Sequence, residues 1–348
     1  MKPPRFAYHR PATVAEAVAT LGSWADGRSA SSRAEGGHGK VLAGGQSLVP
    51  LLNMRLAAPA ALVDINRLGD ELAFVEATPG SVRIGALTRH AQTDASEVAY
   101  AALPLLRQAT RHVAHQTIRN RGTTVGSIVH ADPAGEMPAV LLVCDGEMEL
   151  ASASGRRTVA AADFFTGPLE SALRPDELAI AATFAVPPGR TGSAWVEVSR
   201  RAGDYALCGL GLVVTLGADG AVERARAGYI SVGPTPVLVD LTDAVGGASP
   251  AKADWDAAGT LAASRLDPEE DIHASADYRR ELVRVLTARA GRQAVAHASA
   301  RELAERPSAS ARELAERPSA SARELAERPS ASARELAERP STLGAEVP

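Results

Sequence analysis

Cysteine and aromatic residues are scarce in this sequence. Only Cys144 and Cys208 occur among 348 residues, so the four thiolates of an iron–sulfur cluster or of a cysteine-rich zinc site are not available. Each cysteine lies among apolar or small residues, and we expect two buried thiols rather than a disulfide. The aromatic content of 4% offers little surface on which nucleic acid bases could stack.

Long basic runs and long apolar runs are also absent. The formal net charge is −4, which argues against nucleic acid or a membrane surface as a partner. No stretch of about 18 apolar residues occurs. The N-terminal MKPPRFAYHRP lacks the apolar core of a signal peptide. These absences predict a soluble, cytoplasmic protein.

The pattern of turns and apolar runs predicts three folded parts and a tail. Residues 1–66 form a small α/β lobe, residues 67–187 a second lobe of strands and helices, and residues 188–298 an α+β domain with antiparallel strands. In residues 299–348 the octapeptide RELAERPS occurs four times with a period of 11. Each copy stops at a proline and is shorter than the ~12–15 residues that an isolated helix needs. We therefore expect a disordered, low-complexity tail.

Local patterns also predict individual elements. The strands expected before the third part cover residues 41–42, 62–65, 81–85, 139–150 and 157–161, with a helix over 103–114. The third part is expected to contain strands at 193–199, 207–216 and 222–232, and a helix over 277–297. The predicted class is α+β.

Two glycine-containing stretches carry the clearest chemical signal. AGGQS, residues 43–47, follows a short apolar strand, and glycine lets backbone N–H groups approach an anion closely. RNRGTTVGSIVHADPAGEMP, residues 119–138, adds the hydroxyls of Thr123, Thr124 and Ser127. Two such loops could bind the two phosphates of one pyrophosphate, with Glu136 accepting from ribose hydroxyls. Neither the G-x-G-x-x-G nor the G-x-x-x-x-G-K-[ST] pattern is present.

With these loops in view, the chain resembles the FAD-binding medium subunit of molybdenum hydroxylases, the xanthine dehydrogenase and carbon monoxide dehydrogenase family. The stretches that carry the resemblance are FAYHRP, VLAGGQSLVPLL, LVDINRL, VRIGALT, IRNRGTTVGSIVHADPAGEMPA and EVSRRAGDYAL, spread over residues ~1–297. The repeat tail has no counterpart.

This resemblance implies a two-lobed FAD-binding domain of the vanillyl-alcohol-oxidase-like (PCMH) type, followed by an α+β domain. It implies that FAD is bound by the following residues: Ala43, Gly44, Gly45, Gln46, Ser47, Thr123, Thr124, Val125, Gly126, Ser127, Glu136 and Tyr205. Tyr205 falls beside the isoalloxazine ring, and Glu136 at the ribose. Val125 replaces the family's first glycine, and would be strained if that position needed a positive φ.

The resemblance also implies an electron-transfer subunit without catalytic residues of its own. Its partners would be a large molybdopterin-binding subunit and a small [2Fe–2S] subunit, as a heterotrimer or its dimer. The alternatives are a self-contained FAD-dependent oxidase, for which Asp204 and Tyr205 are the only acid–base candidates, and a nucleotide-binding module without catalysis. His112 and His115 have a spacing that metal sites use, but no further ligand is spaced to join them.

Overall fold

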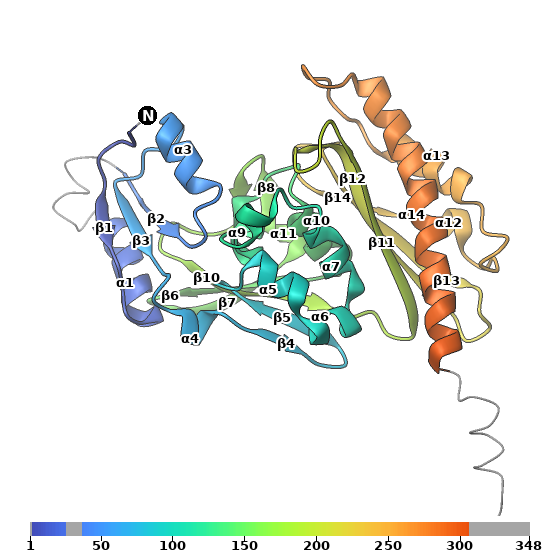
Figure 1. Ribbon diagram of the computed structural model, residues 1–348, viewed down its shortest axis with the longest axis horizontal. Coiled ribbons are helices and arrows are strands. Elements are labelled where there is room, and N and C mark those ends of the chain that lie inside the picture. The colour runs from blue at the N-terminus through green and yellow to red at the C-terminus, as the bar shows by residue number, and fades with distance from the viewer. Residues whose placement is uncertain (1, 26–36, 306–348) are drawn as a thin grey trace, which may run out of the picture. The chain divides into compact units, whose positions relative to one another are not determined.

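The computed structural model describes residues 2–25 and 37–305, with side chains to residue 300 (Figure 1). Residues 2–25 and 37–303 belong to one compact unit. Residues 306–348, which hold most of the predicted tail, lie outside the described residues.

A small parallel sheet begins the chain. Its strands are β1 (Ala7–His9), β3 (Ala61–Asp64) and β2 (Gly39–Leu42), with β3 in the centre. All four residues of β3 are buried, as expected for a central strand with both faces covered. Two helices accompany the sheet, α1 (Val14–Ala25) and α3 (Leu48–Met54).

A five-stranded antiparallel sheet follows, in the order β4-β5-β10-β6-β7. Its strands are β4 (Val75–Ala77), β5 (Ser81–Gly85), β6 (Glu147–Ser152), β7 (Gly155–Ala160) and β10 (Leu178–Ala185). The helices of this part are α4 (Gly69–Leu72), α5 (His90–Ala95), α6 (Glu97–Ala102), α7 (Pro104–Thr110), α8 (Gln116–Arg119), α9 (Thr124–His130), α10 (Glu136–Val143) and α11 (Ala161–Phe164). A short hairpin pairs β8 (Phe165–Gly167) with β9 (Glu170–Ser171).

The strand predicted over residues 139–150 is wrong in its first half. Helix α10 runs to Val143, and only then does β6 begin at Glu147. Every residue of α10 from Met137 to Val143 is buried. A helix that is apolar all round shows no amphipathic period, so its sequence cannot be told from that of a buried strand.

An antiparallel sheet of β11 (Arg190–Ser199), β12 (Ala206–Leu216), β13 (Val222–Ile230) and β14 (Val237–Asp240) forms the last part, as the sequence predicts. Helices α12 (Thr242–Val245), α13 (Trp255–Arg265) and α14 (Ala276–Glu305) follow it in the chain. Figure 1 shows α14 lying along this sheet. The contact is close, because a Cβ on Gly192 would lie 2.0 Å from the carbonyl oxygen of Ala294.

The middle and last parts are packed together through α10. A Cβ on Gly228 in β13 would lie 2.7 Å from the carbonyl oxygen of Ala139. Just before α10, the carbonyl of Pro133 accepts a hydrogen bond of 2.9 Å from the N–H of Ser231. The start of α10 is therefore fixed against the C-terminal sheet. The domain boundaries at residues 66 and 187 stay predictions.

Both cysteines are buried free thiols, as the sequence predicts. Among the described residues, no helix is long and apolar enough to span a bilayer.

Candidate functional site

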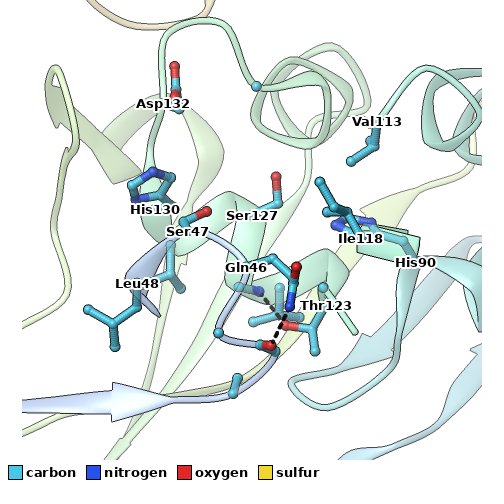
Figure 2. Close-up of a pocket in the computed structure, with 18 of the residues that line it drawn as sticks. Gln46, Ser47, Leu48, His90, Val113, Ile118, Thr123, Ser127, His130 and Asp132 are labelled. Carbon is cyan, nitrogen blue, oxygen red and sulfur yellow. Dashed lines mark hydrogen bonds between the residues drawn. The ribbon is translucent and has the colours of Figure 1, made fainter. Parts of the chain in front are cut away.

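A cavity of about 470 Å³ brings the two glycine-containing stretches together. This volume lies within the ~300–1,000 Å³ typical of small-molecule sites. The residues of the predicted site that line it are Ala43, Gly44, Gly45, Gln46, Ser47, Thr123, Val125, Gly126, Ser127, Glu136 and Tyr205. Figure 2 shows Gln46, Thr123 and Ser127 in one part of this cavity.

The AGGQS loop, residues 43–47, presents unpaired backbone donors. The N–H groups of Gly44, Gly45, Gln46 and Ser47 make no hydrogen bond to any residue that the structure describes. Gly45 has φ = +76°, a backbone conformation that favours glycine. Successive free N–H groups around such a turn form a concave anion-binding site.

The second stretch is the start of a helix rather than a loop. In residues 123–127, the TTVGS segment, Thr123 caps α9 and the other four residues form its first turn. The Thr123 hydroxyl accepts a 3.0 Å hydrogen bond from the N–H of Gly126. A Cβ on Gly126 would lie 2.5 Å from that hydroxyl, which explains the glycine. Val125 is helical, so the strain considered for a positive φ at this position does not arise.

Thr124 is the one predicted site residue that does not line the cavity. Its side chain is fully buried, and its hydroxyl forms a 2.9 Å hydrogen bond with the hydroxyl of Thr93. The expectation that Thr124 supplies a donor hydroxyl to a ligand is therefore not supported by its position. Its hydrogen bond instead ties the start of α9 to α5.

Other residues in the cavity wall were not found from the sequence. Lys40 brings a cation, and His90 brings an imidazole whose side chain is 3% exposed. Burial, with a smaller effect of Arg119, lowers the pKa of His90 to about 4, so this ring is neutral. Among the described residues, none is a hydrogen-bond partner of its Nδ1. Figure 2 places His90 beside Ile118.

Glu136, the first residue of α10, lies in an environment that disfavours its charge. Burial, together with the nearby Glu197, raises the pKa of the Glu136 carboxyl to about 8. Glu197 is itself held by two contacts. Trp195 Nε1–H donates to its Oε2 at 3.0 Å, and His112 Nδ1 lies 3.3 Å from its Oε1. Glu136 is thus largely an uncharged acid near neutral pH, and can donate as well as accept a hydrogen bond.

Tyr205 lies at the edge of the cavity, before β12. Together with Asp132 it also lines a second pocket, so its side chain separates the cavity from this pocket. Its side chain is 71% exposed, which excludes a role as a core aromatic residue.

The paired histidines lie against different neighbours. His112 contacts Glu197, and His115 lies against Gly203, where a Cβ would be 2.4 Å from the His115 ring. Within the described part of the chain, no group of three or more His, Cys, Asp or Glu residues could hold a metal ion.

The cavity suits a dinucleotide with a pyrophosphate. The free N–H groups of the AGGQS loop offer several donors without a covering side chain at Gly44 and Gly45. The N–H of Val125 also bonds to no described residue, and it belongs to the facing TTVGS segment. The residues present therefore fit FAD.

Comparisons with known proteins agree with this chemistry. Residues 4–187 match the family described as FAD binding domain in molybdopterin dehydrogenase, and residues 193–294 match the CO dehydrogenase flavoprotein C-terminal domain. The 6-hydroxypseudooxynicotine dehydrogenase complex subunit alpha of Paenarthrobacter nicotinovorans is 38% identical over 297 residues, covering 83% of this chain and 94% of that relative. The carbon monoxide dehydrogenase medium chain of Hydrogenophaga pseudoflava is 33% identical over 296 residues, with coverages of 83% and 97%.

Solved structures give the same result. A carbon monoxide dehydrogenase structure from Hydrogenophaga pseudoflava matches with a TM-score of 0.76 and 34% identity, covering 85% of this chain and 99% of the other. Quinoline 2-oxidoreductase from Pseudomonas putida 86 matches with a TM-score of 0.75 and 31% identity, with coverages of 86% and 99%. The predicted fold class and the FAD cofactor are thereby confirmed. The chain belongs to the family of FAD-binding subunits of molybdopterin dehydrogenases.

Proposed function

We propose that this chain is the FAD-carrying electron-transfer subunit of a multi-subunit molybdenum hydroxylase. It receives electrons from the [2Fe–2S] clusters of a small partner subunit and delivers them to an external acceptor. The observation that carries the proposal is the cavity in which the unpaired N–H groups of the AGGQS loop face the start of α9. Its two cysteines are too few to hold such a cluster, so partner subunits supply the remaining redox centres.

The chain's own residues bind and orient the cofactor. The AGGQS loop and the TTVGS segment hold the pyrophosphate, with Thr124 acting through Thr93 rather than through a ligand contact. Glu136 offers an uncharged carboxyl, and Tyr205 covers one edge of the site. FAD, when bound, supplies the ability to exchange electrons singly and in pairs.

The partners follow from the family. The relatives are named as subunits or medium chains of larger complexes. We propose a large molybdopterin-binding subunit and a small [2Fe–2S] subunit as the partners, in a heterotrimer or its dimer. The free thiols of Cys144 and Cys208 support a cytoplasmic location, where disulfides are rare.

Purification of the chain alone tests the proposal. We expect a yellow protein that an artificial electron donor reduces, and that does not oxidise N-heterocycles, purines, aldehydes or carbon monoxide. Co-expression with a molybdopterin subunit and a [2Fe–2S] subunit should restore oxidation of an organic substrate. Direct turnover by the single chain would instead indicate the self-contained oxidase, and a colourless protein without flavin affinity would indicate a module without catalysis.

Tyr205→Ala should alter the flavin without unfolding the protein. Because this side chain is 71% exposed, its truncation leaves no core cavity, and we expect the melting temperature to shift by no more than a few degrees. Flavin content should stay near normal, while the flavin spectrum, its reduction potential and its rate of reoxidation change. Melting temperature and reoxidation rate are measured on one sample. Normal reoxidation would remove Tyr205 from the site.

A further inference from the structure

A single asparagine joins the end of β3 to the AGGQS loop. Asn66 Nδ2 donates to the carbonyl oxygen of Ala43 at 2.9 Å and to Asp64 Oδ1 at 2.6 Å. The Asn66 backbone N–H also donates to Asp64 Oδ1, at 2.9 Å. Asp64 is 7% exposed, and its other oxygen accepts from the hydroxyl of Tyr8 in β1. The buried Asp64 side chain therefore fixes Asn66, and Asn66 in turn fixes the AGGQS loop.

The other end of the Asn66 amide reaches the middle part of the chain. Arg89 Nη2 donates to Asn66 Oδ1 at 2.7 Å, and Arg89 Nη1 donates to the carbonyl oxygen of Arg121 at 2.5 Å. The backbones of Arg89 and Thr123 form an antiparallel bridge. The Asn66 amide oxygen faces a cation, and its nitrogen faces three acceptors, the carbonyls of Leu42 and Ala43 and the carboxylate of Asp64. The amide therefore has one consistent orientation.

The carbonyl that Arg89 holds is also where the two phosphate-binding stretches touch. A Cβ on Gly44 would lie 2.3 Å from the carbonyl oxygen of Arg121 and 2.8 Å from the Cα of Gly122. The AGGQS loop thus packs against the backbone that leads into Thr123. The spacing of the two stretches is set at this contact, and Arg89 holds the contacted carbonyl in place.

The anchored carbonyl of Ala43 also fixes the direction of the next N–H. In a trans peptide the C=O and the following N–H point to opposite sides. Since the Ala43 carbonyl is directed at Asn66, the Gly44 N–H is directed away from it, and it bonds to no described residue. This is the first of the free donors assigned above to the pyrophosphate.

We propose that Asn66 and Arg89 form a bridge that positions the two phosphate-binding stretches, so that this pair sets the affinity for the pyrophosphate of FAD without touching it. The proposal rests on the assignment of the AGGQS loop and the TTVGS segment to the pyrophosphate. Asn66 and Arg89 are positioning residues. Neither belongs to the cavity lining.

The test compares three ligands on the full-length, flavin-free protein. FAD and ADP both contain a pyrophosphate, whereas riboflavin has none. Asn66→Leu should weaken FAD and ADP binding by roughly 10- to 100-fold, the effect expected for losing hydrogen bonds to a charged group, and leave riboflavin binding unchanged. Titration by flavin fluorescence, with ADP as a competitor, measures all three.

A second variant and a control make the test specific. Arg89→Met should give the same pattern. The double variant should bind FAD about as tightly as the single variant with the lower affinity, because both substitutions break the same bridge. Arg157→Met is the matched control. Arg157 also joins a carbonyl, that of Ala172, to a side chain, that of Glu177, but neither partner contacts the AGGQS loop or the TTVGS segment through it. The control should lose thermal stability and keep the wild-type FAD affinity.

The outcomes separate this proposal from the proposed function. If wild-type protein binds FAD and both bridge variants bind it within twofold of wild type, the bridge has no positioning role. If riboflavin binding falls in step with FAD and ADP binding, the residues are merely structural and the proposal is overturned. If Asn66→Leu does not fold, Arg89→Met decides, since it keeps the bond between Asn66 and Ala43. A wild-type protein that binds no FAD would instead contradict the proposed function.

Discussion

Gly44→Ala should abolish flavin binding in a protein that still folds. The new Cβ would lie 2.3 Å from the Arg121 carbonyl oxygen, a backbone atom that Arg89 holds in place. No flexible side chain can yield there, so the AGGQS loop and the TTVGS segment must move apart. Because both stretches contribute donors to one pyrophosphate, we expect at least a 100-fold loss of FAD affinity, on the order of 3 kcal/mol.

The measurement is the ratio of visible flavin absorbance to protein absorbance after gel filtration, together with circular dichroism to confirm folding. Gly69→Ala is the matched control, since a Cβ on Gly69 meets nothing within 4 Å and its φ is not positive. The control should retain the wild-type flavin ratio. A normal ratio in Gly44→Ala would show that the contact between the two stretches is irrelevant to the cofactor.

Glu136→Gln should remove a pH-dependent loss of stability. The Glu136 pKa is raised to about 8 in the folded protein, from an ordinary value of 4.5. The folded state therefore holds this proton more tightly than the unfolded state between these two pH values, and stability falls as pH rises across this window. Above pH ~8, the variant should be more stable than wild type by on the order of 5 kcal/mol; at pH ~4.5 the two should be similar.

Urea unfolding of flavin-free protein at several pH values measures this difference. The difference in the free energy of unfolding between the variant and wild type is taken at each pH. Contributions from the other titrating groups, including those with lowered pKa values, cancel in this difference. Glu71→Gln, on an exposed position of α4, serves as the control and should show no such trend. A constant difference between Glu136→Gln and wild type from acid to alkaline pH would mean that folding does not change the pKa of Glu136.

The sequence was most informative where chemistry and local backbone requirements coincide. Gly44, Gly45 and Ser47 were predicted as site residues because free N–H groups and hydroxyls serve an anion, and all three line the cavity. The antiparallel strands of the last part were predicted from turns and apolar runs, and they form one sheet. Both kinds of signal lie within a few neighbouring residues.

Features that depend on distant contacts were not predicted. The sequence predicts a strand where α10 forms, because the burial of this helix on all sides includes contacts with the C-terminal sheet, far along the chain. Thr124 was assigned to the ligand because its partner, Thr93, cannot be known from the local sequence. Asp64 at the end of a buried strand and Asn66 just after it are the one local signal for the bridge, since ligands bind near the carboxyl ends of parallel strands.

The close approach of β13 to α10 has a consequence for synthesis on the ribosome. Helix α10 begins at the cofactor site, but the carbonyl of Ala139 is covered by Gly228, almost ninety residues later in the sequence. While the nascent chain ends before β13, the apolar side chains of α10 have no C-terminal sheet to cover them. N-terminal segments generally fold first, so this intermediate would expose apolar surface until β13 emerges. We therefore expect a fragment ending at residue 187 to aggregate, and cofactor loading to follow completion of the C-terminal sheet.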